Sequence, residues 1–346
     1  MAELPPFVIR SLLGFLLGMA LGVAGRWGRF CTLGAIEDAV YGSDTRRLRS
    51  WLLAIAVAIA GVHALEAFAG LELSRSIYTG SDLAWGGAIV GGLMFGIGMA
   101  LAGTCGYGTL LRLGGGDLKA LVTFLVMALA AMMTMRGAVG PVRLWTTDLL
   151  TSELASASQR LPALLGFHQW GLTVAAFVVA AAMGVAAFIN AAFARSPRSI
   201  ATGVAIGAII VLGWWATGIA GFDLFETRRV ESFSFVAPLG ETLLYLMLAS
   251  GLRPDFPVGA VLGVITGAFV ASKASGEFQW EAPDDAREMR RHLLGALLMG
   301  VGGIVALGCT IGQGITGMST LALGSVLAVT SIFFGARIGL YILVER

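Results

Sequence analysis

Two segments of this chain carry nearly the same order of residues, 204 positions apart. They are Gly96–Gly108 and Gly300–Gly312, and their alignment places Cys105 on Cys309. Each begins as an apolar helix, passes into a glycine-broken stretch that carries the thiol, and is followed by another apolar run. Duplicated, interrupted helices of this kind are the best indication in a sequence of a transporter's substrate site. The repeat therefore predicts a membrane transporter with a sulfur-lined site.

The composition also indicates a membrane protein. Hydrophobic residues make up 57% of the chain and charged residues 13%, whereas a soluble domain carries roughly 25% charged residues. A net charge of +2 is too small to favour nucleic acid as a partner. The three cysteines form no C-x-x-C motif, which argues against a disulfide framework or a paired-thiol redox centre. We expect a lipid bilayer around the chain, and neither a metal nor another cofactor.

Nine apolar runs are long enough, or nearly long enough, to cross a bilayer. They are Phe7–Gly25, Trp51–Leu71, Leu83–Gly103, Leu118–Met135, Trp170–Phe193, Ile200–Gly221, Phe256–Ser272, Leu293–Gly308 and Leu321–Val344. The fold class predicted from them is an all-α integral membrane protein with about nine transmembrane helices.

Four further segments are apolar but interrupted by Gly, Thr or Pro. They are Gly28–Tyr41, Thr104–Gly116, Phe233–Ser250 and Cys309–Thr320. Irregular backbone at membrane depth is tolerated only where protein or a watery cavity surrounds it. We therefore interpret all four as re-entrant half-helices, which enter and leave the membrane on the same side.

The number of crossings between the cysteine segments decides how the two halves are related. If Phe233–Ser250 is re-entrant, five crossings separate the segments and the repeat is inverted; if it spans, the repeat is parallel. Leu33–Gly34 aligns with Leu239–Gly240 at a similar offset of 206, which favours the inverted arrangement and leaves the parallel one open. We predict one domain over 1–346, with a first repeat at 1–137, an external loop and connecting helix at 138–198, and a second repeat at 199–346.

The distribution of positive charge predicts the orientation. With nine spans, fourteen Lys and Arg residues fall on one side of the membrane and eight on the other. The richer side should be cytoplasmic. The N-terminus is then outside, the C-terminus is cytoplasmic, and residues 136–168 form an external loop with room for an interfacial helix.

The cysteines are the candidate site residues. Cys31, Cys105 and Cys309 all lie in glycine-broken segments, and none lies in a plain span. A buried cysteine is often only a small core residue, but this shared placement favours a role in binding. Half-helix N-termini suit an anion, and a thiol suits a soft sulfur atom. Together they predict a site for a sulfur-containing anion.

Other residues near the thiols have weaker assignments. Gly106, Gly108 and Gly312 lie where the helices break, so a turn explains them best. Within the span Trp51–Leu71, His63 and Glu66 are three residues apart on one face. Such a pair could relay protons, although a structural hydrogen-bonded pair is the favoured interpretation.

The chain resembles the YeeE/YedE family of bacterial inner-membrane sulfur transporters, and within it the thiosulfate-uptake branch. The motifs that carry the resemblance follow in order: Gly28–Thr32, Leu101–Gly106, Lys273–Ser275 and Gly308–Gly314. The last motif has Gln313 where Asn is expected in close relatives, which leaves the assignment intact but the loop geometry open.

The resemblance implies an hourglass-shaped protein with an inverted repeat, which is a transporter and not an enzyme. It implies that Cys31, Cys105 and Cys309 pass thiosulfate inward through S–H···S contacts. Thr104, Thr310 and backbone N–H groups would then donate to the sulfonate oxygens. A small cytoplasmic sulfurtransferase-like protein is an expected partner. Sulfite or selenium anions remain alternative substrates, and a membrane thiol oxidoreductase or a Cu(I) transporter is a more distant alternative.

Overall fold

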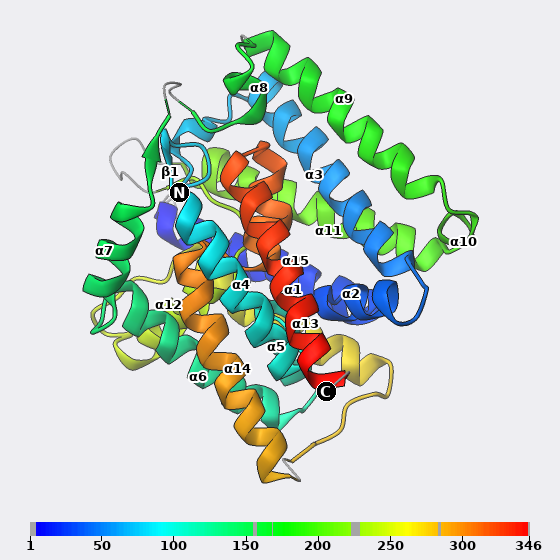
Figure 1. Cartoon of the computed structure of the whole chain (residues 1–346), viewed down its shortest axis with the longest axis vertical. Coiled ribbons are helices and arrows are strands. Elements are labelled where there is room, and N and C mark those ends of the chain that lie inside the picture. Colours follow the sequence, from blue (N-terminus) through cyan, green and yellow to red (C-terminus); the bar gives the residue numbers. More distant parts are fainter. Residues whose placement is uncertain (1–4, 155–157, 168, 223–228, 283–284, 345–346) are drawn as a thin grey trace.

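Most of the structure is helical, and almost none of it is sheet. The computed structural model describes residues 5–154, 158–167, 169–222, 229–282 and 285–344. Within these ranges the only paired strands are β1 (Asp82–Leu83) and β2 (Ser152–Glu153), which form one short antiparallel pair. The fold class is all-α, as the sequence predicts (Figure 1).

A long helix occupies each of the nine predicted spans. These helices are α1 (Pro6–Gly28), α3 (Arg46–Ala69), α4 (Trp85–Ala102), α6 (Leu118–Met135), α9 (Gln169–Phe188), α11 (Pro197–Trp215), α13 (Phe256–Ala274), α14 (Ala286–Val305) and α15 (Leu323–Val344). In the described part of the chain, eight helical runs are long and apolar enough to cross a membrane. The chain is therefore an integral membrane protein.

The ninth long helix, α14, does not meet this criterion. It begins seven residues before the predicted span, and its first two turns carry charged residues from Arg287 to Arg291. Only Leu293–Val305 is apolar, which is short for a span. That α14 crosses the membrane, and hence the count of nine, stays a prediction.

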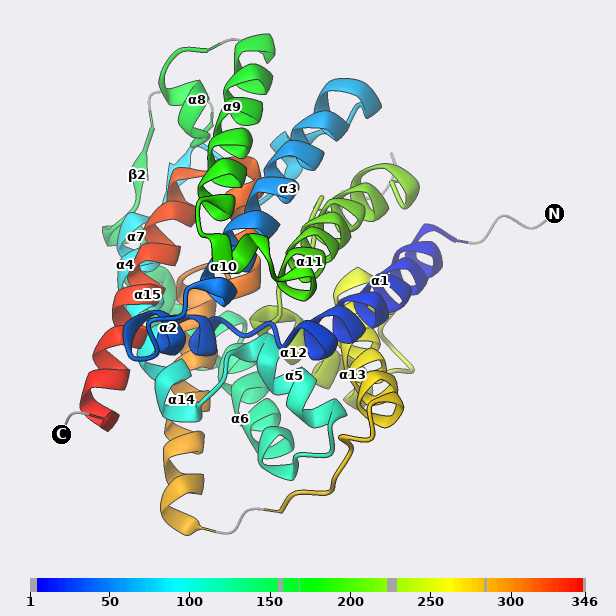
Figure 2. The ribbon, with the colours of Figure 1, turned by 90° about the vertical axis from the view of Figure 1, so that its right-hand side faces the viewer.

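Short helical segments occupy the four interrupted regions. Three are α2 (Thr32–Val40), α5 (Gly106–Gly114) and α12 (Val236–Met247). The fourth follows Cys309 as a π-helical stretch, η3 (Gly312–Gly317), and a 3₁₀ turn, η4 (Met318–Thr320). Figures 1 and 2 show α2, α5 and α12 near the middle of the molecule's long axis, among the long helices. Their re-entrant path through a membrane stays a prediction.

Residues in the left-handed region produce three of the breaks. Arg29 (φ 49°), Gly103 (φ 64°) and Leu307 (φ 57°) end the helices that precede Cys31, Cys105 and Cys309. Gly103 and Leu307 are themselves 204 positions apart. In both turns, backbone N–H groups return to carbonyls three and five residues earlier, which satisfies the end of the helix.

The two halves pair their helices in the same way. α1 packs on α13, and the corresponding α11 packs on α3; α4 packs on α15, and the corresponding α14 packs on α6. Glycines allow these close approaches, because a Cβ at Gly14 would lie 2.4 Å from the Phe256 carbonyl oxygen, and one at Gly207 would lie 2.6 Å from that of Ala54. The repeat and its inverted sense both stay predictions.

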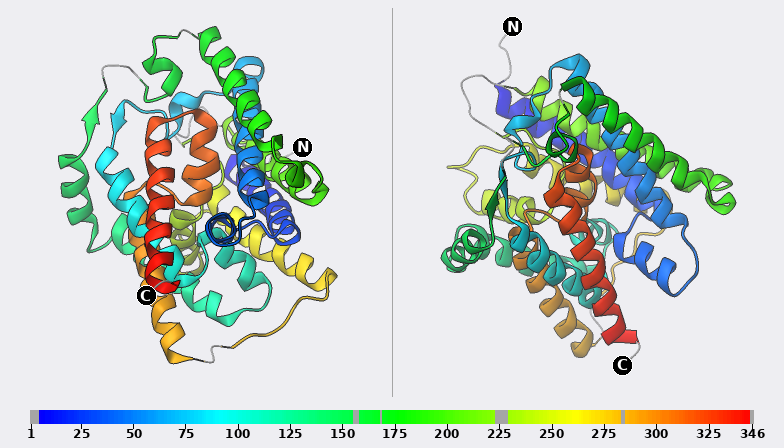
Figure 3. Two further views of the ribbon diagram at one scale, coloured as in Figure 1. Left: turned by 45° about the vertical axis from the view of Figure 1, so that its right-hand side comes forward. Right: turned by 45° about the horizontal axis from the view of Figure 1, so that its top comes forward.

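The predicted connecting helix is shorter than expected. It ends at Phe188 instead of Phe193, and a separate turn, α10 (Ala191–Ala194), follows. The cause is Asn190, whose side-chain oxygen accepts hydrogen bonds from the backbone N–H groups of Ala192 (2.8 Å) and Phe193 (3.4 Å) and so starts a new helix. Figure 3 shows α9 at the edge of the molecule alongside α3, which it contacts.

The region predicted to hold the external loop and the connecting helix, 138–198, contains further short elements. Before α9 it holds α7 (Gly140–Leu149) and α8 (Leu161–Leu164), and elsewhere the chain forms the short turns η1 (Leu73–Arg75) and η2 (Ala216–Ala220). The side of the membrane on which they lie stays a prediction. Arg228 and Arg346, which the charge count includes, lie outside the described residues.

Candidate functional site

Cys105 and Cys309 are in the same local structure. Each directly precedes a short helix, and each sulfur accepts a hydrogen bond from the backbone N–H three residues later. The donors are Gly108 to Cys105 and Gly312 to Cys309, and both N···S distances are 3.4 Å. The thiol thus takes the place of the oxygen that usually caps a helix N-terminus. Both cysteines are fully buried.

Cys31 holds the equivalent N-cap position at the start of α2. It is half-buried, and its side chain makes no capping hydrogen bond. A Cys-x-x-Gly spacing is nevertheless common to all three thiols and was the signal in the sequence that could have revealed the cap. The fourth segment, α12, differs: Phe235 occupies the cap position, and Pro238 has no N–H to donate.

The starts of α2 and α5 lie against each other. The hydroxyl of Thr32, the first residue of α2, lies 3.9 Å from the Cys105 sulfur, to which it donates a weak hydrogen bond. Thr32 directly follows Cys31 in the chain. The structure thus brings together the Cys31 and Cys105 segments, as the sequence predicts.

Phe235 connects the Cys105 segment to the Cys309 segment. Its backbone N–H faces the Cys309 sulfur. The Phe235 ring lies 5.3 Å from the ring of Tyr107 on α5. A Cβ added at Gly106 would lie 3.8 Å from the Cβ of Phe235. The starts of all four short segments therefore lie close to one another, which allows one ligand to meet several helix N-termini.

The predicted threonine donors are in different states. The hydroxyl of Thr104 donates to the Cys105 carbonyl at 3.4 Å, so it is already engaged. The hydroxyl of Thr310 is buried and has no hydrogen-bond partner in the described part of the chain. A buried hydroxyl without a partner carries a desolvation cost, so Thr310 is the stronger candidate for a ligand contact.

Gln313 has a structural role in addition to its place near the site. Its Nε2 donates to the Ala306 carbonyl at 2.7 Å, and its Oε1 accepts from the Ser325 hydroxyl at 2.7 Å. These bonds tie the Cys309 turn to α15. The predicted glycines also differ: a Cβ at Gly108 would lie 2.3 Å from the Thr104 hydroxyl, whereas one at Gly106 would meet only ordinary contacts beyond 3.7 Å.

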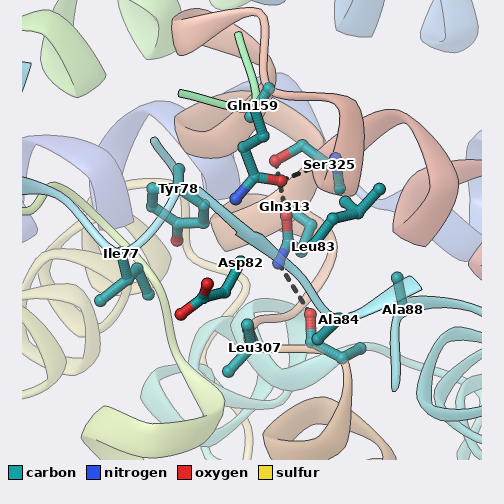
Figure 4. Close-up of a pocket in the computed structure, with 13 residues that line it drawn as sticks. Ile77, Tyr78, Asp82, Leu83, Ala84, Ala88, Gln159, Leu307, Gln313 and Ser325 are labelled. Atoms are coloured by element: carbon teal, nitrogen blue, oxygen red, sulfur yellow. Dashed lines mark hydrogen bonds between the residues drawn. The ribbon is translucent and has the colours of Figure 1, made fainter. Parts of the chain in front are cut away.

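A small pocket opens beside the Cys309 turn (Figure 4). Its volume is about 20 Å³, room for one water molecule. Tyr78, Asp82 and Gln159 line it together with Gln313 and Ser325. Burial raises the pKa of the Tyr78 phenol well above its usual value, and the nearby Cys309 sulfur adds to the shift. Tyr78 is therefore a neutral hydrogen-bond donor, and nothing in the sequence singled it out.

A second, polar pocket of about 270 Å³ lies at the opposite end of α5. Its charged lining combines Arg26, Arg112, Lys119, Asp117, Glu277, Glu281 and Glu288. Arg112 ties this pocket to the Cys105 turn, because its Nη2 donates to the Gly103 carbonyl at 2.8 Å. The mixture of signs means that the pocket is not a simple anion trap.

His63 and Glu66 do not form the predicted pair. Glu66 accepts two hydrogen bonds from the Arg160 guanidinium, at 2.6 and 2.7 Å, while His63 Nδ1 is bonded to the Ile59 carbonyl at 2.9 Å. Arg160 lies 94 residues away from Glu66, so no helical spacing indicated it. The Glu66–Arg160 ion pair instead fastens the segment before α8 to α3.

Long apolar helices that surround broken, thiol-capped segments define a polytopic membrane transport protein. Comparison with protein families is specific: the model of the family described as sulphur transport matches residues 27–338. The chain belongs to this family, and it is a transporter and not an enzyme.

Two relatives are similar to the chain over most of its length. Thiosulfate transporter TsuA of Escherichia coli (strain K12) is 28% identical over 325 residues, which cover 88% of this chain and 86% of that protein. Thiosulfate transporter TsuA of Spirochaeta thermophila is 29% identical over 336 residues, which cover 93% and 94%.

Proposed function

We propose that this protein imports thiosulfate across the bacterial inner membrane through a central pathway lined by Cys31, Cys105 and Cys309. The observation that carries the proposal is that all three thiols lie at helix starts that are close to one another, two of them with a capping hydrogen bond to the sulfur. The printed function of both relatives supports thiosulfate as the substrate.

The pathway offers complementary groups to the two ends of thiosulfate. The terminal sulfur is large and polarizable, and it suits a thiol better than it suits water. The oxygens accept hydrogen bonds from backbone N–H groups at the helix starts and from the free hydroxyl of Thr310. Tyr78 and the small pocket beside Cys309 form the entrance, so the anion meets Cys309 first, then Cys105 and finally Cys31.

The orientation follows from the positive charge count. We place the N-terminus outside, the C-terminus in the cytoplasm, and the polar pocket around Arg112 at the cytoplasmic exit. A small sulfurtransferase-like protein would receive the anion there. The mixed charge of the pocket suits an exit, because carboxylates beside arginines hold the anion only loosely and favour its release.

Cysteine replacement tests the proposal. Cys105→Ala and Cys309→Ala should abolish growth on thiosulfate as the sole sulfur source while the protein is still made and inserted. Gly106→Ala is the matched control, because a Cβ there meets only ordinary contacts, and it should grow normally. Near-normal uptake of labelled thiosulfate by both cysteine variants would refute the proposed role.

Competition experiments identify the substrate. Unlabelled thiosulfate should reduce uptake of the labelled anion in proteoliposomes, while equal concentrations of sulfite or selenite should reduce it much less. Stronger competition by sulfite or selenite would show that the same architecture transports that anion instead.

A further inference from the structure

A third cavity, larger than the two pockets described above, shares no lining residue with either of them. Its volume is about 590 Å³, and its walls come from α2, α3, α15 and the end of α9. Its lining is almost entirely apolar, with Ile55, Ile332 and Phe333 among the side chains. We call it the lateral crevice.

The crevice is about as deep as one leaflet of a bilayer. Along α3 its lining runs from Thr45 to Ile55, which is about 15 Å at the rise of an α-helix. The hydrocarbon core of a bilayer is about 30 Å thick. The crevice therefore begins at one end of α3, where the polar headgroups of a leaflet lie, and ends near the membrane midplane.

The shallow end of the crevice carries positive charge. Arg49 lines it, and its Nε donates to Thr45 Oγ1 at 3.2 Å while its Nη1 donates to the carbonyls of Ala186 and Ala187 at the end of α9. Its Nη2 has no protein partner among the described residues, and no described carboxylate pairs with it. The exposed Arg46 lies one turn before it. Arg46 is already paired with Asp44, so an anionic headgroup would complement the charge of Arg49.

The deep end of the crevice meets the thiol site. Thr310 and Gly314, from the segment after Cys309, line it, and so does Thr32, whose hydroxyl reaches the Cys105 sulfur. The crevice and the thiol site therefore share wall residues. Left open, this side of the site would be exposed to whatever fills the crevice.

We infer that the lateral crevice binds one acyl chain of an anionic phospholipid, whose headgroup is held by Arg49 and whose chain closes the lateral wall of the thiol site. Apolar walls of one leaflet's depth fit a lipid tail, and a guanidinium with a free N–H fits a phosphate. Binding of the lipid does not depend on thiosulfate being the substrate; only its role as a wall rests on the proposed function.

Trp51 provides a local reporter of the occupant. It lines the crevice, stacks on Phe30 at 4.5 Å and is only 7% exposed. Bromine atoms on an acyl chain quench tryptophan fluorescence on contact. Trp51 should therefore be quenched by brominated lipid only if a chain enters the crevice, and not by lipid at the protein surface.

The experiment uses the full-length protein in liposomes of brominated or ordinary phosphatidylglycerol. The quenching due to Trp51 is the difference between the wild type and Trp51→Phe, with Trp51→Tyr as a second variant in case the first fails to fold. Trp170→Phe is the matched control, because Trp170 lies on the outside of α9 and is 74% exposed. We expect brominated lipid to quench Trp51 about as strongly as Trp170.

Two further arms identify the headgroup and exclude another occupant. Brominated phosphatidylglycerol should quench Trp51 more strongly than brominated phosphatidylcholine, and Arg49→Gln should remove this difference. If Trp51 stays bright in brominated lipid while Trp170 is quenched, the inference is wrong; a dimer with its contact at the crevice, detected by cross-linking, would also overturn it. Either result would leave the proposed transport through the cysteines untouched.

Discussion

The turns at Cys105 and Cys309 have the same backbone and different surroundings. Both follow a left-handed residue, and in both the sulfur accepts a backbone N–H at 3.4 Å. Yet Cys105 starts a regular α-helix and meets the hydroxyl of Thr32, whereas Cys309 leads into a π-helical stretch beside Tyr78.

The segments that bond to the chain after each turn also come from different parts of the sequence. The strand-like segment at 279–281 bonds to the residues after α5, through Gln279 to Gly115 and Glu281 to Gly116. The segment at 159–161 bonds to the residues after η4, through Leu161 to Leu321. The thiol cap is therefore common to both turns, while the neighbouring segments differ between them.

The largest effect is expected from variants that keep the capping hydrogen bond but replace the sulfur with oxygen. Cys105→Ser and Cys309→Ser keep an acceptor for the capping N–H, so thermal stability should change little. Thiosulfate uptake should nevertheless be lost, because a hydroxyl is a poor match for a soft sulfur atom. Thermal melting checks the stability of each serine variant, and uptake in proteoliposomes checks its transport. Wild-type uptake by either serine variant would show that the cysteine at that turn acts only as a cap.

The second prediction compares how tightly the two turns are packed. Gly108→Ala places a Cβ 2.3 Å from the Thr104 hydroxyl, and Gly312→Ala places one 2.5 Å from that of Ser234. Each should lower the free energy of unfolding by about 1–3 kcal/mol.

Second-site variants distinguish the two turns. Thr104→Ala removes the nearest atom to the added methyl group and leaves the next at 3.7 Å, so it should restore most of the stability lost by Gly108→Ala. Ser234→Ala leaves a Cβ at 2.9 Å and should restore little of the loss from Gly312→Ala. Equal rescue in both melting curves would contradict the structural difference.

The third prediction concerns the Glu66–Arg160 ion pair, which supports the turn at Cys309 and not the turn at Cys105. Glu66→Gln breaks the ion pair that holds Arg160, and with it the segment that bonds to Leu321. We expect a loss of about 2 kcal/mol and faster hydrogen exchange after Cys309 than after Cys105.

An exposed ion pair is the control for that variant. Asp44→Asn removes the partner of Arg46 at the surface, and exposed pairs contribute at most about 1 kcal/mol. Exchange should rise at neither turn. If Glu66→Gln accelerates exchange equally at both turns, the segment at 159–161 does not act on Cys309 alone.

The smallest effect concerns the left-handed residues before the two cysteines. Leu307→Gly relieves the strain of a side chain at φ 57° and should raise the free energy of unfolding by about 1 kcal/mol. Gly103→Ala introduces the same strain and should lower it by a similar amount, since a Cβ there has space. Opposite shifts in melting temperature are expected, and shifts of the same sign would contradict this account.

The sequence predicts the fold well where length and apolarity decide the outcome. All nine long helices lie where apolar runs indicate, because an apolar run in a membrane has few alternatives to a helix. The predicted end of α9 was wrong because Asn190 can cap a new helix inside an otherwise continuous apolar run. The charged start of α14 belongs to the helix but not to the apolar run, so apolarity alone could not find it.

The sequence predicts the site less completely, since the missing parts depend on contacts between distant segments. The cysteines and the breaks before them were visible as a repeat. Tyr78, the Glu66–Arg160 pair and the lateral crevice were not, because each arises where elements far apart in the chain meet. Thr104 and Thr310 looked alike in the sequence, and only the packing shows that one hydroxyl is engaged and the other is free.

The thiol cap leaves each sulfur able to donate. Each sulfur accepts a backbone N–H, from Gly108 or Gly312, so its own S–H stays available as a donor. In the proposed pathway these two donors would attract an anion and would offer no negative charge to a soft cation such as Cu(I). Anions would then be selected without a charged side chain beside the cysteines.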